Sequence, residues 1–230
     1  MTVRSFRNLA CLAVVTAFLV SCSSTHRLYM ESLRLAFRSG PEKSLADIQQ
    51  SKIDLMQIEL GDRNPAFLAL AYLENDQHKW VSADHAVFVF HHDKLVQTSG
   101  FATDVLSTSH LDTNPLVDIA SANTTTWQYT IDIANHEYGL PVESTFKKDG
   151  TVTKSFYGQT FTLDKWVETV RTEPSTPYWD SAYDWENSYL VEPVSGNVFY
   201  SEQTASPFTE TMVITYVSRI ARHIKNSGGL

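Results

Sequence analysis

The feature that most constrains the fold of this chain is a two-residue alternation of apolar and polar side chains, repeated in short segments. Residues 127–133 (WQYTIDI) place Trp, Tyr and two Ile at every second position, with polar residues between them. Residues 56–60 (MQIEL) repeat the pattern. Because alternate residues of a strand face the same side, each segment predicts a β-strand with one buried face.

Turn-forming residues separate these segments at the spacing of an antiparallel meander. Asn75-Asp76 separates two apolar segments, and Asp149-Gly150 is the strongest hairpin signal, because this pair readily adopts the positive φ angles of a tight turn. Further strands are predicted over 67–73, 86–90, 95–98, 161–170, 189–191, 198–200 and 212–217. Short helices are predicted over 25–38 and 44–48. The sequence therefore predicts a mainly β domain with a few short helices.

The N-terminal residues have the composition of a bacterial export signal. Arg4 and Arg7 precede a mostly apolar run over 9–20, which is long enough for the core of a signal peptide but short for a membrane span. Ser21 and Cys22 follow directly, an order that resembles the lipobox of bacterial lipoproteins. In that class the cysteine thiol is acylated, the leader is removed before it, and the new amino group is acylated too. We therefore expect Cys22 to carry acyl chains such as palmitate.

Acylation of Cys22 predicts how the protein is anchored. One acyl chain holds a protein to a bilayer weakly, whereas two or three together hold it almost permanently. Ser23 stands where an aspartate favours inner-membrane retention in similar enterobacterial lipoproteins, so the resemblance implies the periplasmic face of the outer membrane. The expected organisation is a signal peptide over 1–21, a lipidated tether with short helices over 22–50, and a mostly β periplasmic domain over 51–230. The alternative is a soluble secreted protein with an ordinary cleavage site.

Charge and cysteine content exclude several functions. The chain carries a formal net charge of −8, and the leader holds two arginines and no acid, so the remainder is more acidic still. Such a surface repels nucleic acid, and the basic residues over 219–225 are interpreted as a brief tail. Cys11 lies in the leader, so beyond it the chain keeps Cys22 alone. We expect no disulfide, thiol nucleophile or zinc–thiolate site, and the core must hold the fold.

Four stretches stand out by their order and spacing: FLALAYLE at 67–74 with KWVSAD at 79–84, DKLVQTSG at 93–100, TNPL at 113–116, and YLVEPVSGNV at 189–198 with SEQ at 201–203. In this order they resemble the group 4 capsule polysaccharide lipoproteins of Gram-negative bacteria, the YjbF/GfcB type. The chain departs from the family at Glu192, where aspartate is frequent, and at Asp93-Lys94, where a glycine is usual. Both positions are interpreted as turn-making.

The resemblance implies an outer-membrane lipoprotein that works with the machinery for making or exporting a capsule or exopolysaccharide. It also implies a curved antiparallel sheet, or partial barrel, packed with a few short helices. The lipidated Cys22 is the one functional residue that it carries over, with no catalytic residue, metal or cofactor. The expected partners are the outer membrane, through the acyl chains, and either polysaccharide export proteins or the polysaccharide itself.

Residues 178–187 (YWDSAYDWEN) are the candidate glycan-binding stretch. The rings of Trp179, Tyr183 and Trp185 would pack on the apolar faces of sugars, while neighbouring carboxylates and amides would bind hydroxyls. The alternative is that Trp179 and Trp185 fill the core or rim of the sheet, as buried tryptophans generally do. The other tryptophans in strand-like segments are predicted to lie in the core, namely Trp80, Trp127 and Trp166.

Catalytic and metal-binding motifs are not evident. Adjacent strand residues point to opposite faces, so His91-His92-Asp93 is interpreted as a solvated turn rather than a metal site. The chain contains no Gly-x-Ser-x-Gly or His-Glu-x-x-His motif. The sequence therefore predicts a non-enzymatic accessory lipoprotein. The alternatives are a lipid- or glycan-binding carrier module with an apolar pocket, and a polysaccharide-modifying enzyme whose carboxylates, such as Asp180 and Asp184, converge in a cleft.

Overall fold

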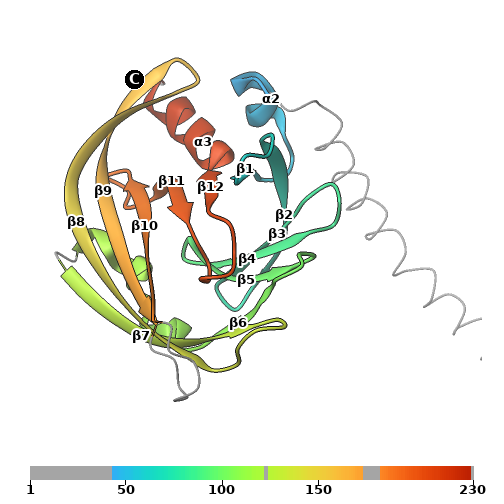
Figure 1. Cartoon of the computed structure of the whole chain (residues 1–230). Helices are drawn as coiled ribbons and strands as arrows, with labels where there is room; N and C mark the ends of the chain where they lie inside the picture. Colours follow the sequence, from blue (N-terminus) through green and yellow to red (C-terminus); the bar gives the residue numbers. More distant parts are fainter. Residues whose placement is uncertain (1–42, 122–123, 173–181, 229–230) are drawn as a thin grey trace, which may run out of the picture. The chain divides into compact units, whose positions relative to one another are not determined.

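Over residues 43–121, 124–172 and 182–228, the computed structural model of this chain describes one antiparallel sheet of twelve strands, with α2 and α3 together at one end (Figure 1). The helices are α2 (Leu45–Gln50) and α3 (Val217–Ser227), with 3₁₀ segments η1 (Leu111–Thr113) and η2 (Pro115–Ser121). The strands are β1 (Leu55–Leu60), β2 (Ala66–Glu74), β3 (Gln77–Val81), β4 (Val87–His91), β5 (Lys94–Ser99), β6 (Val105–Thr108), β7 (Thr124–Ile133), β8 (Leu140–Phe156), β9 (Gln159–Thr172), β10 (Tyr183–Val191), β11 (Val198–Gln203) and β12 (Met212–Thr215). The predicted mainly β fold, a curved sheet or partial barrel with few helices, is confirmed.

The sheet is a meander in which the first strand pairs with the last. Its order is β5-β4-β3-β2-β1-β12-β11-β10-β9-β8-β7-β6. Every neighbour in this order is also a neighbour in the sequence, except β1 and β12, which pair antiparallel over Gln57–Leu60 and Met212–Thr215. The chain therefore curls into a nearly closed, barrel-like sheet (Figure 1).

The two edge strands, β5 and β6, close the sheet through side chains. The Val105 amide donates to Thr98 Oγ1 at 3.0 Å, and Thr108 Oγ1 donates to the Val96 carbonyl at 2.7 Å. Thr98 Oγ1 also donates to Asp104 Oδ1 at 2.9 Å. Edge strands otherwise expose unpaired amides and carbonyls, so these bonds satisfy polar groups that a complete ladder would pair.

Three hairpins turn on two-residue loops whose residues both have positive φ, the conformation that matches the twist of the adjoining strands. The loops are Asn75-Asp76, His92-Asp93 and Tyr157-Gly158. The hairpin predicted at Asp149-Gly150 is wrong, because β8 continues through these residues. They form a β-bulge in which both oppose Lys165 alone, and Gly150 supplies the positive φ there. The same backbone preference that suggested a turn is used to bend a long strand.

The helix α2 begins with a capping box, and the prediction of a short helix there is confirmed. The Asp47 amide donates to Ser44 Oγ, while the Ser44 amide donates to the Asp47 carboxylate. Although this helix was expected to belong to the tether, Gln49 Nε2 donates to the Ala221 carbonyl of α3 at 3.4 Å. The helix predicted over 25–38 lies outside the described residues.

The C-terminal helix α3 is an element that sequence analysis did not predict. The residues interpreted as a brief basic tail lie on it. Its buried residues include Val217, Ile220, Ala221 and Ile224, the i, i+3, i+4, i+7 spacing of an amphipathic helix. The sequence contains this spacing. The helix was missed because it follows the apolar strand β12 almost directly, so the two were interpreted as one strand and a tail.

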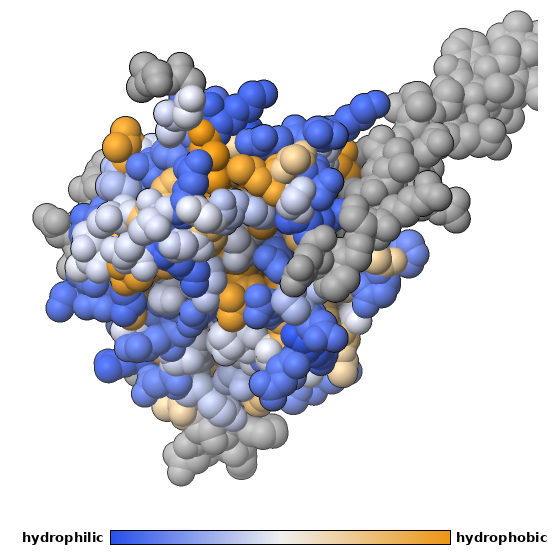
Figure 2. All heavy atoms as spheres, turned by 90° about the horizontal axis from the view of Figure 1, so that it is seen from above, coloured by the Kyte–Doolittle hydropathy of each residue, from blue (hydrophilic) through white to orange (hydrophobic). Residues whose placement is uncertain are grey.

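The main core fills the inside of the curved sheet. The alternating residues of β7 behave as predicted, since Trp127, Tyr129, Ile131 and Ile133 are all buried. Trp80 and Trp166 are buried as well, which confirms the predicted core tryptophans. A second, smaller cluster lies between α3, the tip of the β8–β9 hairpin and β10–β11, and contains Phe156, Leu163, Leu190, Phe199, Ile220 and Ile224. Figure 2 looks onto the α2–α3 end and shows apolar atoms gathered in its middle among hydrophilic ones.

A buried ion pair crosses the interior between β5 and β9. Lys94 Nζ donates to Glu168 Oε1 and Oε2 at 2.8 and 2.6 Å, and both side chains are almost fully buried. Glu168 Oε2 also accepts from Asn187 Nδ2 and the Tyr189 hydroxyl, each at 2.8 Å. Burial and the Glu168 carboxylate raise the pKa of Tyr189 well above its ordinary value, so its hydroxyl remains a donor. The carboxylate is thereby satisfied without water.

Replacing Glu168 by glutamine should destabilise the protein strongly, because it leaves the Lys94 ammonium buried without a counter-charge. We expect the free energy of unfolding to fall by about 3–5 kcal/mol. Asp164→Asn is the matched control, because its partner Lys148 is 42% exposed and such a pair is worth less than about 1 kcal/mol. Urea denaturation followed by tryptophan fluorescence measures both. Equal losses in the two variants would contradict the special role of the buried pair.

Candidate functional site

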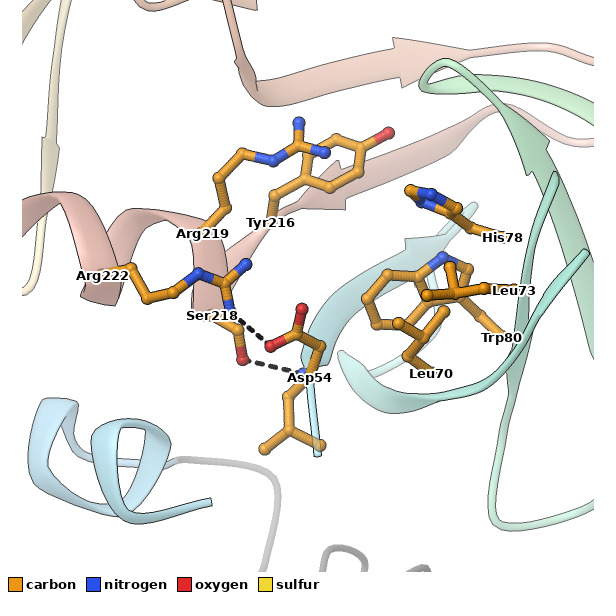
Figure 3. Close-up of a pocket in the computed structure, with 10 residues that line it drawn as sticks. Asp54, Leu70, Leu73, His78, Trp80, Tyr216, Ser218, Arg219 and Arg222 are labelled. Atoms are coloured by element: carbon orange, nitrogen blue, oxygen red, sulfur yellow. Dashed lines mark hydrogen bonds and ion pairs between the residues drawn. The ribbon is translucent and has the colours of Figure 1, made fainter. Parts of the chain in front are cut away.

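A small pocket lies between the β2–β3 hairpin and the first turns of α3, and we call it the hairpin pocket (Figure 3). Its volume is about 150 Å³. The pocket has an apolar wall from the hairpin and a polar wall from α3 and the start of β1. The lining residues are Asp54, Leu55, Leu70, Leu73, His78, Trp80, Tyr216, Ser218, Arg219 and Arg222.

A β-bulge in β2 builds the apolar wall. Leu70 pairs with Trp80 and Leu73 pairs with His78, while the register shifts between Leu70 and Tyr72 and leaves Ala71 as an extra residue. Paired residues of antiparallel strands share a face, and two residues three apart on a regular strand do not. The bulge therefore turns Leu70 and Leu73 to the same side, where both line the pocket with Trp80 and His78.

The polar wall is anchored by hydrogen bonds from α3. Ser218 Oγ accepts from the buried Leu55 amide at 2.8 Å, which joins the start of β1 to the helix. Arg222 Nη1 forms an ion pair with Asp54. The Arg219 guanidinium lies over the Tyr216 ring, 4.4 Å from its centroid, and donates to both carboxylate oxygens of Asp93 at 2.8 and 2.9 Å. This bidentate geometry is the strong form of an ion pair.

His78 and Trp80 bring two polar edges to the pocket. Burial lowers the pKa of His78, while the Asp93 carboxylate opposes this shift and Arg219 acts in the same direction as burial. Trp80 is 6% exposed, and its Nε1–H has no hydrogen-bond partner among the described residues. Figure 3 shows this nitrogen on the edge of the ring that faces Tyr216 and His78. The nitrogen itself is buried, so this donor carries the desolvation cost of an unpaired polar group.

The turn His92-Asp93 corrects the expectation of a solvated turn at His91-His92-Asp93. His91 is 6% exposed, and Asn114 Nδ2 donates to its carbonyl at 2.8 Å. Gln203 Nε2 donates to the Asp93 carbonyl at 2.8 Å, while Gln203 Oε1 accepts from the Leu95 amide at 2.9 Å. Asp93 lies in the turn, as interpreted, and also forms an ion pair with Arg219, whereas Lys94 begins β5 and places its charge in the interior.

Only part of the predicted glycan-binding stretch lies in the described residues, because Trp179 and Asp180 fall outside them. The predicted lipidation site, Cys22, also lies outside the described residues. Trp185 is half-buried, donates from Nε1 to the Thr204 carbonyl at 2.9 Å and packs against the main core. The Tyr183 ring meets Phe208 edge-on, with centroids 5.4 Å apart. The structure therefore gives Trp185 a packing role at the rim of the sheet, the alternative that the sequence left open.

Two open grooves meet on the face of the sheet opposite the main core, and together we call them the outer groove. Their volumes are about 610 and 630 Å³, and both are lined by Lys154 and Tyr200. Lys154 Nζ lies 3.5 Å from the Tyr200 ring centroid, and the Tyr200 hydroxyl donates to Glu202 at 2.6 Å. The remaining charged residues of the lining are Lys43, Glu59, Lys165 and Glu186. The outer groove thus alternates lysines, carboxylates and aromatic rings.

The residues that the structure describes contain no group of three or more His, Cys, Asp or Glu side chains able to hold a metal ion. Asp184 is exposed and lies 3.7 Å from Arg171. None of the helices described has the length and apolar character needed to span a bilayer.

The family assignment follows from comparison with known proteins. The profile described as "Group 4 capsule polysaccharide lipoprotein gfcB, YjbF" matches residues 30–217. The chain belongs to this family. The resemblance found in the sequence is thus confirmed, and the family ties the chain to lipoproteins associated with capsule polysaccharide. The third matching stretch, at 113–116, coincides with the 3₁₀ segments, and Glu192 accepts from the Ser195 amide at 2.7 Å, as a turn-making residue should.

Relatives in Escherichia coli K12 share most of the chain. One, "Uncharacterized lipoprotein GfcB", is 26% identical over 200 residues, covering 84% of this chain and 89% of the relative. Another, "Uncharacterized lipoprotein YjbF", is 26% identical over 197 residues with the same coverage. The crystal structure of the "hypothetical lipoprotein YmcC" from the same organism matches with a TM-score of 0.67 at 24% identity, over 76% of this chain and 88% of that one. This likeness supports the fold.

Replacing Ser218 by alanine should loosen the contact between β1 and α3. The buried Leu55 amide loses its acceptor, so we expect the free energy of unfolding to fall by about 1–3 kcal/mol. Ser227→Ala removes an exposed hydroxyl near the end of the same helix and should change stability by less than about 0.5 kcal/mol. Thermal unfolding compares the two variants. An unchanged melting temperature in Ser218→Ala would contradict this role.

Proposed function

We propose that this lipoprotein is a non-enzymatic accessory factor in capsule or exopolysaccharide assembly or secretion, held on the periplasmic face of the outer membrane by acyl chains on Cys22. The observation that carries the proposal is the family match over residues 30–217. The leader and lipobox over 1–22 agree with it, since acylation at that cysteine holds a protein to a bilayer.

The outer groove supports direct contact with the polysaccharide, in addition to contact with export proteins. Its two halves adjoin at Lys154 and Tyr200 and cross β1, β2 and β8–β12, so the surface is extended rather than point-like. A polymer fits an extended open groove, whereas a small ligand fits an enclosed pocket. The lysines and carboxylates of the groove can form hydrogen bonds with sugar hydroxyls, and the Tyr200 ring can pack on the apolar face of a sugar.

A carrier of lipid in an apolar pocket receives less support. The interior of the sheet is filled by large side chains that are fully buried, including Trp127, Trp166, Tyr189, Phe90 and Phe146. The hairpin pocket is about 150 Å³, and charged and polar side chains form one of its walls. None of these three cavities is an apolar chamber that would hold an acyl chain. We therefore place the function on the surface of the domain.

Replacing Cys22 by alanine should abolish anchoring and function together. In a strain that lacks the natural gene, we expect Cys22→Ala to leave the outer-membrane fraction and to fail to restore surface polysaccharide, because no acyl chains hold the domain in place. Cys11→Ala, within the expected leader, is the matched control and should behave as the natural protein. Membrane fractionation, mass spectrometry of the N-terminal peptide and quantification of surface polysaccharide are the measurements. Outer-membrane fractionation of Cys22→Ala would count against the anchor.

Replacing Tyr200 by alanine should weaken retention of the polymer. We expect less polysaccharide to co-purify with the intact lipoprotein from detergent-solubilised envelopes, because the substitution removes the ring and its Lys154 and Glu202 contacts. Tyr138→Ala is the control, since Tyr138 is 70% exposed and does not line the groove. Equal co-purification with both variants would contradict binding in the groove. A purified protein that shortens the polymer or alters its composition would contradict the non-enzymatic role.

A further inference from the structure

We propose that Asn114 and His91 form an acid-sensitive latch. A neutral His91 ring holds the segment over 110–119 against the β4–β5 hairpin, and protonation of the ring releases it. The segment contains η1 and the first residues of η2, and its Leu116 and Ile119 are buried in the main core. The latch is a property of the domain and does not depend on the proposed function.

The orientation of the Asn114 amide is fixed by hydrogen bonds on both sides. Its Oδ1 accepts from the Leu116 amide at 3.1 Å, and its Nδ2 donates to the His91 carbonyl at 2.8 Å. Turning the side-chain amide round would set its NH₂ group against the Leu116 N–H and its oxygen against the His91 carbonyl. The nitrogen of the Asn114 side chain therefore faces His91.

This orientation assigns the protonation state of the His91 ring. Asn114 Nδ2 also lies 3.3 Å from His91 Nδ1. An amide NH₂ group is a donor only, so Nδ1 accepts and carries no proton, and the neutral ring is protonated at Nε2. An imidazolium would point a second N–H at the N–H of Asn114. Because His91 and Asn114 are only 6% and 2% exposed, the loss of this bond leaves buried donors without acceptors.

Most of the groups around His91 also oppose its protonation. Burial lowers the pKa of His91, His92 and His78 act in the same direction, and Asp76 opposes them. The His92 ring stands edge-on to the His91 ring, with centroids 4.6 Å apart. Lys94, the cross-strand partner of His91, is a further cation, and its own counter-charge is engaged in the buried ion pair.

Acid therefore weakens the latch. A histidine whose pKa is lower in the closed form than in the open form stabilises the closed form at high pH. The closed form is fully favoured above the ordinary histidine pKa of about 6.5 and loses stability as the pH falls below that value. The carboxylates of the segment itself, Asp112 and Asp118, are exposed, so solvent screens them from the buried ring.

The test is hydrogen–deuterium exchange of the full-length lipoprotein in detergent, about one pH unit above and about one unit below the ordinary histidine pKa. Mass spectrometry measures exchange, corrected for the intrinsic effect of pH on amides. The peptide over 110–119 reports on the latch, and the peptide over 127–133 reports on the neighbouring sheet.

Three variants separate the latch from general effects of acid. His91→Gln removes the titrating ring and keeps an amide oxygen as an acceptor. Asn114→Asp places a carboxylate beside His91 Nδ1, which favours the protonated ring. His85→Asn is the matched control, because His85 is exposed, lies outside the segment, and has a positive φ that asparagine tolerates.

We expect protection of 110–119 to fall about tenfold at the lower pH in the natural protein and in His85→Asn, with 127–133 unchanged. His91→Gln and Asn114→Asp should lose this dependence. Unchanged protection in the natural protein, or an equal fall in His91→Gln, would overturn the latch. If His91→Gln folds poorly, Asn114→Asp decides, since a fall as large as that of the natural protein would overturn the proposal. Exchange of the ring C2 hydrogen measures the His91 pKa directly, and an ordinary value would overturn the assignment of a neutral ring.

Discussion

The Lys94–Glu168 ion pair is the interaction on which the arrangement of the interior depends. It holds the β4–β5 hairpin against β9 and β10, across the inside of the curved sheet. The preceding residue, Asp93, then receives Arg219 and the Tyr216 hydroxyl from the start of α3. Breaking the first contact would therefore disturb the second, and with it the wall of the hairpin pocket. Buried charges are tolerated here because every oxygen of Glu168 has a donor.

Two bulges shape the surfaces that this fold offers to ligands. The bulge at Ala71 brings Leu70 and Leu73 to one side and builds the apolar wall of the pocket. The bulge at Asp149-Gly150 lies in the long β8, whose far end, with β9, curls toward α3 and borders the outer groove (Figure 1). In both places one extra residue reverses the alternation of side chains, so a surface appears where a regular strand would present its other face.

The first residues of α3 connect the two candidate surfaces. Val217 lines the outer groove, whereas Ser218 lines the hairpin pocket. The two surfaces therefore meet at adjacent residues of one helix.

The sequence by itself determined the strand pattern, the mostly β class and the family, because these depend on residue order and local preference. The alternation at 127–133 correctly predicted a strand with one buried face. The tryptophans in strand-like segments were correctly predicted to lie in the core. Tertiary structure decided the rest. Asp149-Gly150 has the backbone preference of a turn, yet the neighbouring strand makes it a bulge. Asp93, in a turn, and Lys94, the first residue of β5, find charged partners more than seventy residues away. The hairpin pocket combines β1, a bulged hairpin and α3, and such long-range pairing has no signature in local periodicity.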